Sequence, residues 1–203
     1  MFNTLRMRIV LILTLLIVAV MVVVGTFLIG SVSSYAHDDF RRQMLSVFSN
    51  EELLADLSAA AEGDFAHAAL DDILRAYSGW IGIDSYRNYY ILGPDASLLA
   101  GSDADAGAAL PLTPNLILAL KGELGSETSA SADYLDFTLP LLSEEGEVEY
   151  IVYIKDSKDE IREQVWMLFA IVLQALLFGL LIALSMSYFL ARAITLPVET
   201  LTR

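Results

Sequence analysis

Cysteine is absent from this chain of 203 residues, and histidine occurs twice. Without cysteine the chain has no disulfide bond, no thiolate metal site and no cysteine nucleophile. The two histidines, His37 and His67, are not at the spacing of a metal-binding pair, and the sequence has no glycine-rich phosphate loop. We therefore expect no catalytic residue and no cofactor in these 203 residues.

Basic residues are scarce as well. The sequence holds 12 Lys and Arg against 26 Asp and Glu, which gives a formal net charge of −14. A protein that binds nucleic acid needs a basic surface to neutralise phosphates. This balance therefore predicts no nucleic-acid partner.

Two long stretches, positions 9–30 and 164–191, contain no charged residue. A helix rises about 1.5 Å per residue, so each run is long enough to cross the ~30 Å hydrocarbon core of a bilayer. We assign 9–30 and 165–191 to transmembrane helices, with the lipid bilayer as their partner. Alternatively, the first run is a cleaved signal peptide, because Ser34-Tyr35-Ala36 resembles a cleavage site. The run exceeds the usual apolar region of about 7–15 residues, which favours a retained span.

The distribution of charge predicts the orientation of the chain in the membrane. Arg6 and Arg8 precede the first span, and Arg192 and Arg203 follow the second. The segment 31–164 between the spans has 8 Lys and Arg against 25 Asp and Glu, a net charge of −17. Because arginine accumulates on the cytoplasmic side, we expect a plasma-membrane protein with cytoplasmic termini, residues 1–8 and 192–203, and an extracellular segment 31–164.

Hydrophobic periodicity predicts an α+β fold for the extracellular segment. Helical spacing covers positions 40–48, a capping box at Ser49–Glu52 opens a second helix, and a third follows Asp64 and ends at Ser78-Gly79. Alternating stretches at 86–92, 97–100, 134–142 and 148–154 predict two hairpins, and Thr113 and Gly122 bound a short helix. A capping box at Ser157–Glu160 opens the last helix. We expect a small antiparallel sheet with helices packed on it.

One basic residue interrupts the aromatic residues of the expected sheet. Arg87 shares a strand face with Tyr89, and Tyr134 and Tyr153 lie on the other expected strands. An arginine among aromatic rings is suited to bind a ligand carboxylate, so these four residues form a candidate ligand site. The alternative is a surface arginine that stacks on a tyrosine.

An acidic turn joins the last two expected strands. It carries Glu144, Glu145 and Glu147. One interpretation is a cation-binding site, since a domain of charge −17 beside a membrane concentrates divalent ions or cationic peptides. The other is a charged, solvated turn.

The second span carries small residues at intervals of four: Ala175, Gly179, Ala183 and Ser187. Such a ladder allows two helices to approach closely, and Gln174 beside it can form a hydrogen bond across a helix pair. The pattern indicates a dimer contact, although small residues are common in membrane helices.

The residues after the second span follow a heptad seam. Ile194, Pro197 and Leu201 recur at a-to-d spacing, which is typical of a parallel helical bundle. Pro197 removes a backbone N–H and so predicts a joint between the membrane helix and a cytoplasmic helix. We expect these three residues to transmit a signal.

The stretch "ARAITLPVET" and the leucine after it resemble the opening helix of a HAMP domain, whose signature is Arg-x-Ile-Thr-x-Pro-hydrophobic-x-x-Leu. The stretches "YYILGPDASLLAGS" and "YIVYIKDSKDEIREQV" resemble the extracellular PAS-like, Cache-type sensors of two-span bacterial sensor histidine kinases, such as the cell-wall-metabolism sensor kinases of low-GC Gram-positive bacteria. On this resemblance, residues 192–203 are the truncated start of HAMP.

The resemblance implies the input half of a receptor. It would be a homodimer that senses an unidentified extracellular ligand, ion or protein. A kinase region absent from these residues would use ATP and Mg and would act on a cytoplasmic response regulator. Two alternatives remain open: the same input on a chemotaxis transducer or diguanylate cyclase, and a membrane-anchored binding protein without an output domain.

Cysteine labelling tests the predicted orientation. Because the chain has no cysteine of its own, Ser143→Cys and Thr4→Cys each create a single reactive thiol. A membrane-impermeant reagent should label Cys at position 143 in intact cells, and Cys at position 4 only after the cells are opened. The reverse pattern would contradict the extracellular placement of residues 31–164.

Overall fold

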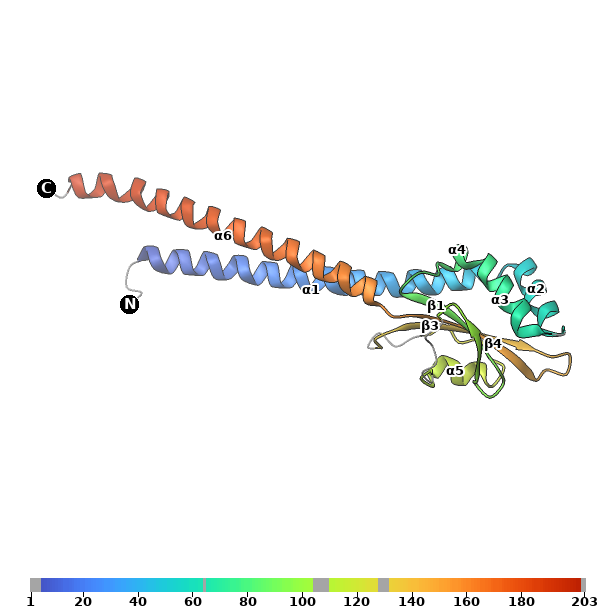
Figure 1. Ribbon diagram of the computed structural model, residues 1–203. Coiled ribbons are helices and arrows are strands. Elements are labelled where there is room, and N and C mark those ends of the chain that lie inside the picture. The colour runs from blue at the N-terminus through green and yellow to red at the C-terminus, as the bar shows by residue number, and fades with distance from the viewer. Residues whose placement is uncertain (1–4, 64, 104–109, 128–131, 202–203) are drawn as a thin grey trace. The chain divides into compact units, whose positions relative to one another are not determined.

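The computed structural model describes the backbone of residues 5–63, 65–103, 110–127 and 132–201, and their side chains except those of 5–10, 13, 160 and 187–201. The described residues form six helices and four strands (Figure 1). They divide into two units: a helical unit, residues 1–33 and 162–203, and an α+β unit, residues 34–161.

The helical unit consists of parts of two long apolar helices, α1 (Leu5–Val47) and α6 (Asp159–Leu201). Both are long and apolar enough to cross a membrane, with mean hydropathies of 2.8 for the candidate span in α1 and 2.7 for that in α6. Each helix continues into the α+β unit, where α1 supplies residues 34–47 and α6 begins at Asp159.

The α+β unit contains a four-stranded antiparallel sheet with the order β2-β1-β4-β3. The strands are β1 (Arg87–Leu92), β2 (Leu98–Gly101), β3 (Leu135–Leu142) and β4 (Val148–Asp156). Both expected hairpins are present, and the mixed α+β class is confirmed. The pairing of β1 with β4 joins the hairpins and places Arg87 opposite Asp156.

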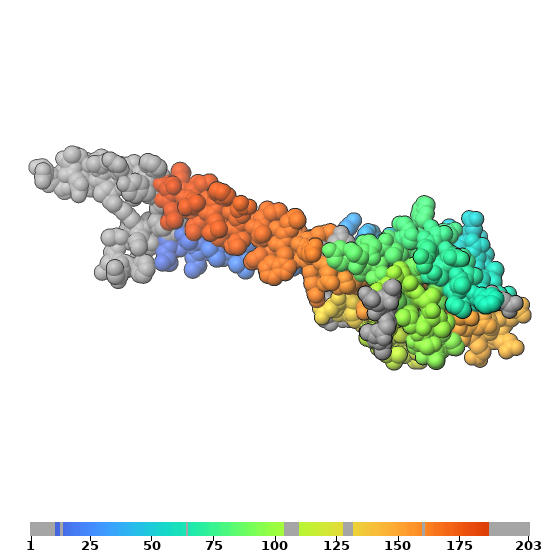
Figure 2. Space-filling model, in the orientation of Figure 1, coloured from blue at the N-terminus to red at the C-terminus, as the bar shows by residue number. Residues whose placement is uncertain are grey.

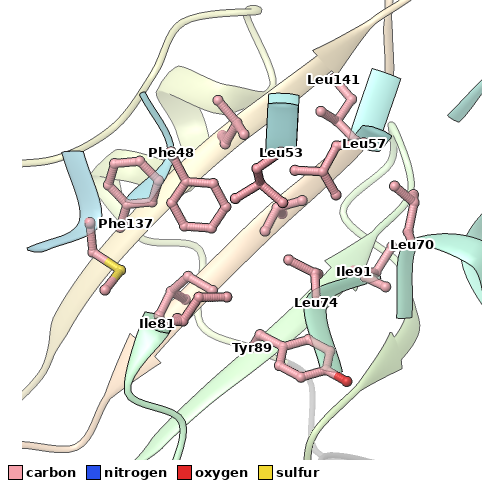
Figure 3. Close-up of a cluster of buried hydrophobic side chains, with 14 of the residues drawn as sticks. Phe48, Leu53, Leu57, Leu70, Leu74, Ile81, Tyr89, Ile91, Phe137 and Leu141 are labelled. Atoms are coloured by element: carbon pink, nitrogen blue, oxygen red, sulfur yellow. The ribbon is translucent and has the colours of Figure 1, made fainter. Parts of the chain in front are cut away.

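Helices cover one face of the sheet. The end of α1 lies there with α2 (Glu51–Ala61), α3 (Ala66–Ala76) and α4 (Ser78–Ile81) (Figure 1). Figure 2 shows side chains of α2 and α3 on the outer surface of this layer. Beneath them lies the larger core, in which the rings of Phe48 and Phe137 stack at 5.1 Å (Figure 3). Its buried residues come from α1–α4, from the turn after α1 and from all strands except β2: Phe40, Met44, Phe48, Leu53, Leu57, Ala61, Leu70, Leu74, Ile81, Tyr89, Ile91, Leu135, Phe137, Leu139, Leu141, Val152 and Ile154.

A short helix, α5 (Pro114–Ala119), covers the opposite face. As expected, Thr113 caps it, accepting a hydrogen bond from the Leu116 N–H. The smaller core beneath α5 comprises Tyr90, Leu92, Leu116, Ala119, Ile151 and Tyr153. Buried polar bonds fix α5 to β3: Asn115 Nδ2 donates to Asp136 Oδ1 at 2.7 Å, and Thr138 Oγ1 donates to the Asn115 carbonyl at 2.9 Å.

Three helix ends differ from the sequence expectation. Asn50 caps α2, accepting from the N–H groups of Glu52 and Leu53, whereas the Ser49 hydroxyl donates back to the Ser46 carbonyl. Ser78 starts the extra turn α4 in place of ending the helical region. Lys158 has φ +59° and lies before the helix, so α6 begins at Asp159, one residue later than expected, and the Ser157 hydroxyl accepts from the Asp159 N–H at 3.4 Å.

Gly125 is required where the loop before β3 meets that strand. Its N–H donates to the Thr138 carbonyl at 3.0 Å and its carbonyl accepts from the Thr138 N–H at 2.8 Å. A Cβ at position 125 would lie 2.7 Å from Asn115 Cα and closer still to Thr138 Oγ1. We expect Gly125→Ala to lower the free energy of unfolding by about 1–3 kcal/mol, because the added methyl overpacks this contact.

Gly79→Ala is the matched control. A Cβ at Gly79 would meet nothing within 4 Å, and alanine favours the helix in which it lies. Thermal unfolding, monitored by circular dichroism, should therefore show a lower melting temperature for Gly125→Ala and not for Gly79→Ala. Equal melting temperatures for both variants would contradict the close contact.

Candidate functional site

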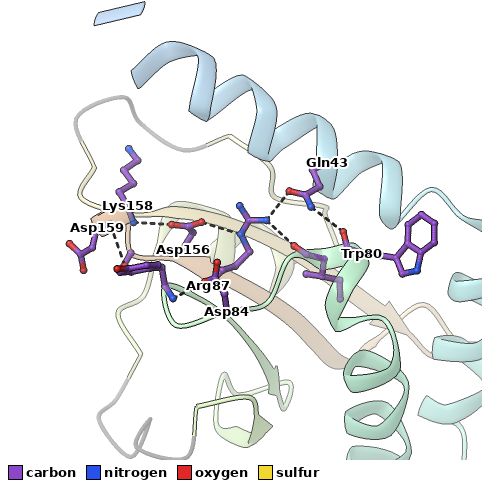
Figure 4. Close-up of polar contacts among 10 residues, drawn as sticks. Gln43, Trp80, Asp84, Arg87, Asp156, Lys158 and Asp159 are labelled. Atoms are coloured by element: carbon purple, nitrogen blue, oxygen red, sulfur yellow. Dashed lines mark hydrogen bonds and ion pairs between the residues drawn. The ribbon is translucent and has the colours of Figure 1, made fainter. Parts of the chain in front are cut away.

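Arg87, at the start of β1, is the centre of a partly buried polar cluster (Figure 4). Its side chain is 16% exposed. The guanidinium Nε donates to Asp156 Oδ2 at 3.0 Å, and Nη1 donates to Gln43 Oε1 and to the Ile81 carbonyl, both at 2.8 Å. The guanidinium carbon also lies 4.9 Å from the centroid of the Phe40 ring, a cation–π distance.

Asp156, the last residue of β4, forms an ion pair with Arg87 and accepts a hydrogen bond through each of its two carboxylate oxygens. Oδ2 accepts from Arg87, and Oδ1 accepts from the backbone N–H of Lys158 at 2.9 Å. The Asp156 side chain is 11% exposed. Removing one partner of such a buried pair leaves an uncompensated charge and costs about 3–5 kcal/mol. The pair therefore links the side chains of two residues that already face each other in the pairing of β1 with β4.

Gln43 connects this cluster to a cleft on the helical side. Its Oε1 accepts from Arg87, and its Nε2 donates to the Trp80 carbonyl at 3.0 Å. The Trp80 side chain is 74% exposed and lines a cleft of about 440 Å³. The other lining residues come from the ends of α1 and α3 and from the segments that follow them: Ser46, Val47, Asn50, Ala76 and Tyr77.

A second polar group lies on the same face of the sheet. Tyr89 is 2% exposed, and its hydroxyl donates to Asp71 Oδ1 at 2.7 Å. The other oxygen of Asp71 pairs with Arg75 at 2.7 Å on the surface of α3. Burial, and then the hydrogen bond to Asp71, raises the pKa of Tyr89 to about 12. This phenol therefore remains protonated and fixes β1 to α3.

The four residues of the candidate ligand site do not meet in one place. Arg87 and Tyr89 lie on the face covered by α1–α4, whereas Tyr153 belongs to the core on the opposite face. Burial also raises the pKa of the Tyr153 phenol. Tyr134 lies just before β3, with the Lys155 ammonium 6.0 Å from its ring. The Arg87 guanidinium donates three hydrogen bonds. Two of the acceptors, on Gln43 and Asp156, belong to elements that the sequence analysis did not place beside Arg87.

The acidic turn of the second hairpin carries Glu144, Glu145 and Glu147 at its exposed tip. The turn is closed by the Ser143 N–H, which donates to the Glu147 carbonyl at 2.8 Å, and by Gly146 at φ +85°. Among the described residues, no group of three or more His, Cys, Asp or Glu side chains could hold a metal ion. Cation binding at this turn stays a prediction.

The positions assigned to a dimer contact follow one another along α6. Gln174 and Ala175 are exposed, and Gly179 and Ala183 are partly exposed. A Cβ on Gly179 would meet nothing within 4 Å, so small residues leave this part of the helix open. The side chains of Ser187, Ile194, Pro197 and Leu201 lie outside the described residues, although α6 continues as a helix to Leu201.

A scan against protein-family models and a search of curated proteins find no match for this chain. Evidence on its function therefore comes from its own residues and their arrangement.

The raised pKa of Tyr89 predicts a dependence of stability on pH. The unfolded chain loses this proton near pH 10, whereas the folded unit retains it to about pH 12. The stability that the protonated Tyr89 phenol contributes to the folded unit is therefore fully present below pH 10 and is lost as the pH rises to 12. Tyr89→Phe should remove the loss of stability that Tyr89 causes between pH 10 and 12. At neutral pH the same substitution should lower the free energy of unfolding by about 1 kcal/mol, because the hydrogen bond to Asp71 is lost.

Melting temperatures of wild type and Tyr89→Phe, measured across this pH window, give the test. Burial also raises the pKa values of Tyr153 and Tyr90, which are present in both proteins. They therefore contribute the same loss of stability at alkaline pH to both. If the two proteins lose stability equally between pH 10 and 12, Tyr89 does not titrate as the geometry indicates.

Proposed function

We propose that this chain is the sensing and transmembrane signalling input of a two-component sensor histidine kinase. One observation carries the proposal: the α+β unit includes the end of one apolar helix and is followed closely by the other. Phe40 and Met44 of α1, and Phe48 just after it, are 0–4% exposed within the core, and two residues separate β4 from α6. A change in the α+β unit therefore acts directly on both helices.

The architecture supports a PAS-like, Cache-type sensor as the finer fold. The sequence resemblance implies a small antiparallel sheet with N-terminal helices. The four-stranded sheet has α1–α4 on one face and α5 on the other. The charge pattern supports an extracellular position for this unit, between two spans.

The stimulus in this proposal is an extracellular ligand, ion or protein. The cleft beside Trp80 suits a small molecule, because its volume of about 440 Å³ lies within the ~300–1,000 Å³ of ligand pockets. Ser46 and Asn50 supply polar groups, and Tyr77 and Trp80 supply aromatic surface. This combination is typical of sites that bind small organic ligands.

The output would pass along α6 to the residues that resemble HAMP. A homodimer whose second spans contact each other through Ala175, Gly179 and Ala183 would transmit a rotation or displacement of α6 to the cytoplasm. Pro197, in the HAMP-like stretch, would adjust the direction of the cytoplasmic helix. ATP and Mg would serve the kinase region, and a response regulator would receive the phosphoryl group.

A chimeric receptor tests this function. Residues 1–203 would be joined, in the register of Pro197, to the HAMP and kinase regions of a sensor kinase, and one to seven alanines inserted between Arg192 and Ala193. One alanine turns the helix by about 100°, and seven restore its phase to within about 20°. Autophosphorylation in membranes should therefore vary periodically with the number of alanines.

An alanine inserted between Glu145 and Gly146 is the control. It lengthens the exposed turn between β3 and β4 and leaves the phase of α6 unaltered, so the output should not change. Kinase activity that ignores every insertion after Arg192 would contradict a signalling role, and would favour a membrane-anchored binding protein.

A further inference from the structure

We propose that Arg87, Gln43 and Asp156 form a clamp that fixes helix α1 to the end of β4, and that opening this clamp is the step by which the α+β unit repositions its two long helices. This inference rests on the proposed function, and it assigns to Arg87 a positioning role in place of ligand binding. The three residues are defined here as the clamp.

The clamp joins segments that are far apart in the sequence. Gln43 lies on α1, Arg87 begins β1 and Asp156 ends β4. Nη1 of Arg87 holds α1 and the end of α4, and Nε holds β4, with all three hydrogen bonds at 2.8–3.0 Å. One planar guanidinium therefore sets the spacing between α1 and the last strand. Lysine could not make these contacts in the same geometry, because its charge is a single point.

Asp156 extends the clamp to the start of α6. Its Oδ1 accepts from the Lys158 N–H, and Lys158 is held at φ +59°, a left-handed conformation that non-glycine residues rarely adopt. Asp159, the first residue of α6, follows directly. Strained residues persist where the surroundings hold them, and they occur often at switch positions. Release of Asp156 would remove one of these restraints and let the joint relax.

The backbone at Gly82 is shaped around the clamp. Gly82 has φ +76°, and a Cβ at this position would lie 2.7 Å from Arg87 Nη1 and 3.2 Å from Gln43 Nε2. The turn after α4 therefore leaves no room for a side chain beside the guanidinium. Such close packing makes the clamp sensitive to small movements of α4.

The cleft gives a stimulus a path to the clamp. Trp80 lines the cleft with its exposed side chain, while its carbonyl accepts from Gln43 Nε2. Val47, one helical turn after Gln43 on α1, lines the same cleft. A group that enters the cleft moves α4 against α1 and so acts on the bond between Trp80 and Gln43.

Distance measurements on the full chain in nanodiscs test the clamp. The chain has no cysteine, so spin labels can be placed at Asp39→Cys on α1 and Glu163→Cys on α6, both exposed positions. Arg87→Met removes the charge and all three hydrogen bonds. It should shift or broaden the distance between these labels by about 2 Å or more, the size of helix shifts in switching proteins. Arg87→Lys should give an intermediate result.

Local controls separate this effect from unfolding. A label pair at Ser58→Cys on α2 and Asp72→Cys on α3 should keep its distance in Arg87→Met if the unit stays folded. Arg75→Met removes an exposed ion pair that touches neither long helix, and it should leave both label pairs unchanged. If Arg87→Met does not fold, Gln43→Met removes only the α1 arm and should still shift the first distance.

The outcomes distinguish the clamp from the receptor function. If Arg87→Met, or Gln43→Met in its place, lowers the melting temperature but leaves the distance between positions 39 and 163 unchanged, the residues are merely stabilising and the clamp is refuted. If the distance shifts but the chimeric kinase ignores every insertion after Arg192, the clamp stands and the signalling proposal fails.

Discussion

The structure depends on one long helix, α1, which is long and apolar enough to cross a membrane and whose last part contributes to a protein core. The sequence of α1 has no charged residue between positions 9 and 30, which suits a bilayer, whereas its last part carries charged residues beside apolar ones. Phe40 and Met44 of this last part, and Phe48 just after it, are buried in the larger core, where Phe48 stacks on Phe137 of β3. The end of α1 therefore shares a core with α2, α3, α4 and the sheet, and this part of the helix belongs to the α+β unit.

Electrostatics adds a second constraint. The segment between the spans has 25 acidic residues against 8 basic ones, so it repels itself. Arg87 is a basic residue held largely inside this acidic unit, and Asp156 compensates its charge directly. Two backbone or amide acceptors and an aromatic ring complete its surroundings. The ion pair joins β1 to β4, and the hydrogen bond from the same guanidinium to Gln43 adds α1 to this arrangement.

Much of the fold could be predicted because its signals are local. Alternation identified all four strands to within about two residues, and Thr113 identified the start of α5. The face shared by Arg87, Tyr89 and Ile91 follows from a period of two, and it is confirmed. The prediction that Ser49 caps α2 was wrong by one residue, because Ser49 and the adjacent Asn50 both carry a side-chain oxygen that can cap a helix. The left-handed Lys158 carries no sequence signal, since non-glycine residues take this conformation only where their surroundings enforce it.

The candidate site shows which features of this protein follow from its sequence alone and which depend on the tertiary structure. By itself the sequence determined two apolar spans, the charge between them and the strands and helices of an α+β unit, because composition and periodicity act over short distances along the chain. Only the tertiary structure decided that β1 pairs with β4, although residues 93–147 lie between them in the sequence. That pairing brings Arg87 to Asp156, and the packing of α1 adds Gln43. The partners of a buried charge are chosen by this long-range packing, since no local pattern specifies which strands become neighbours.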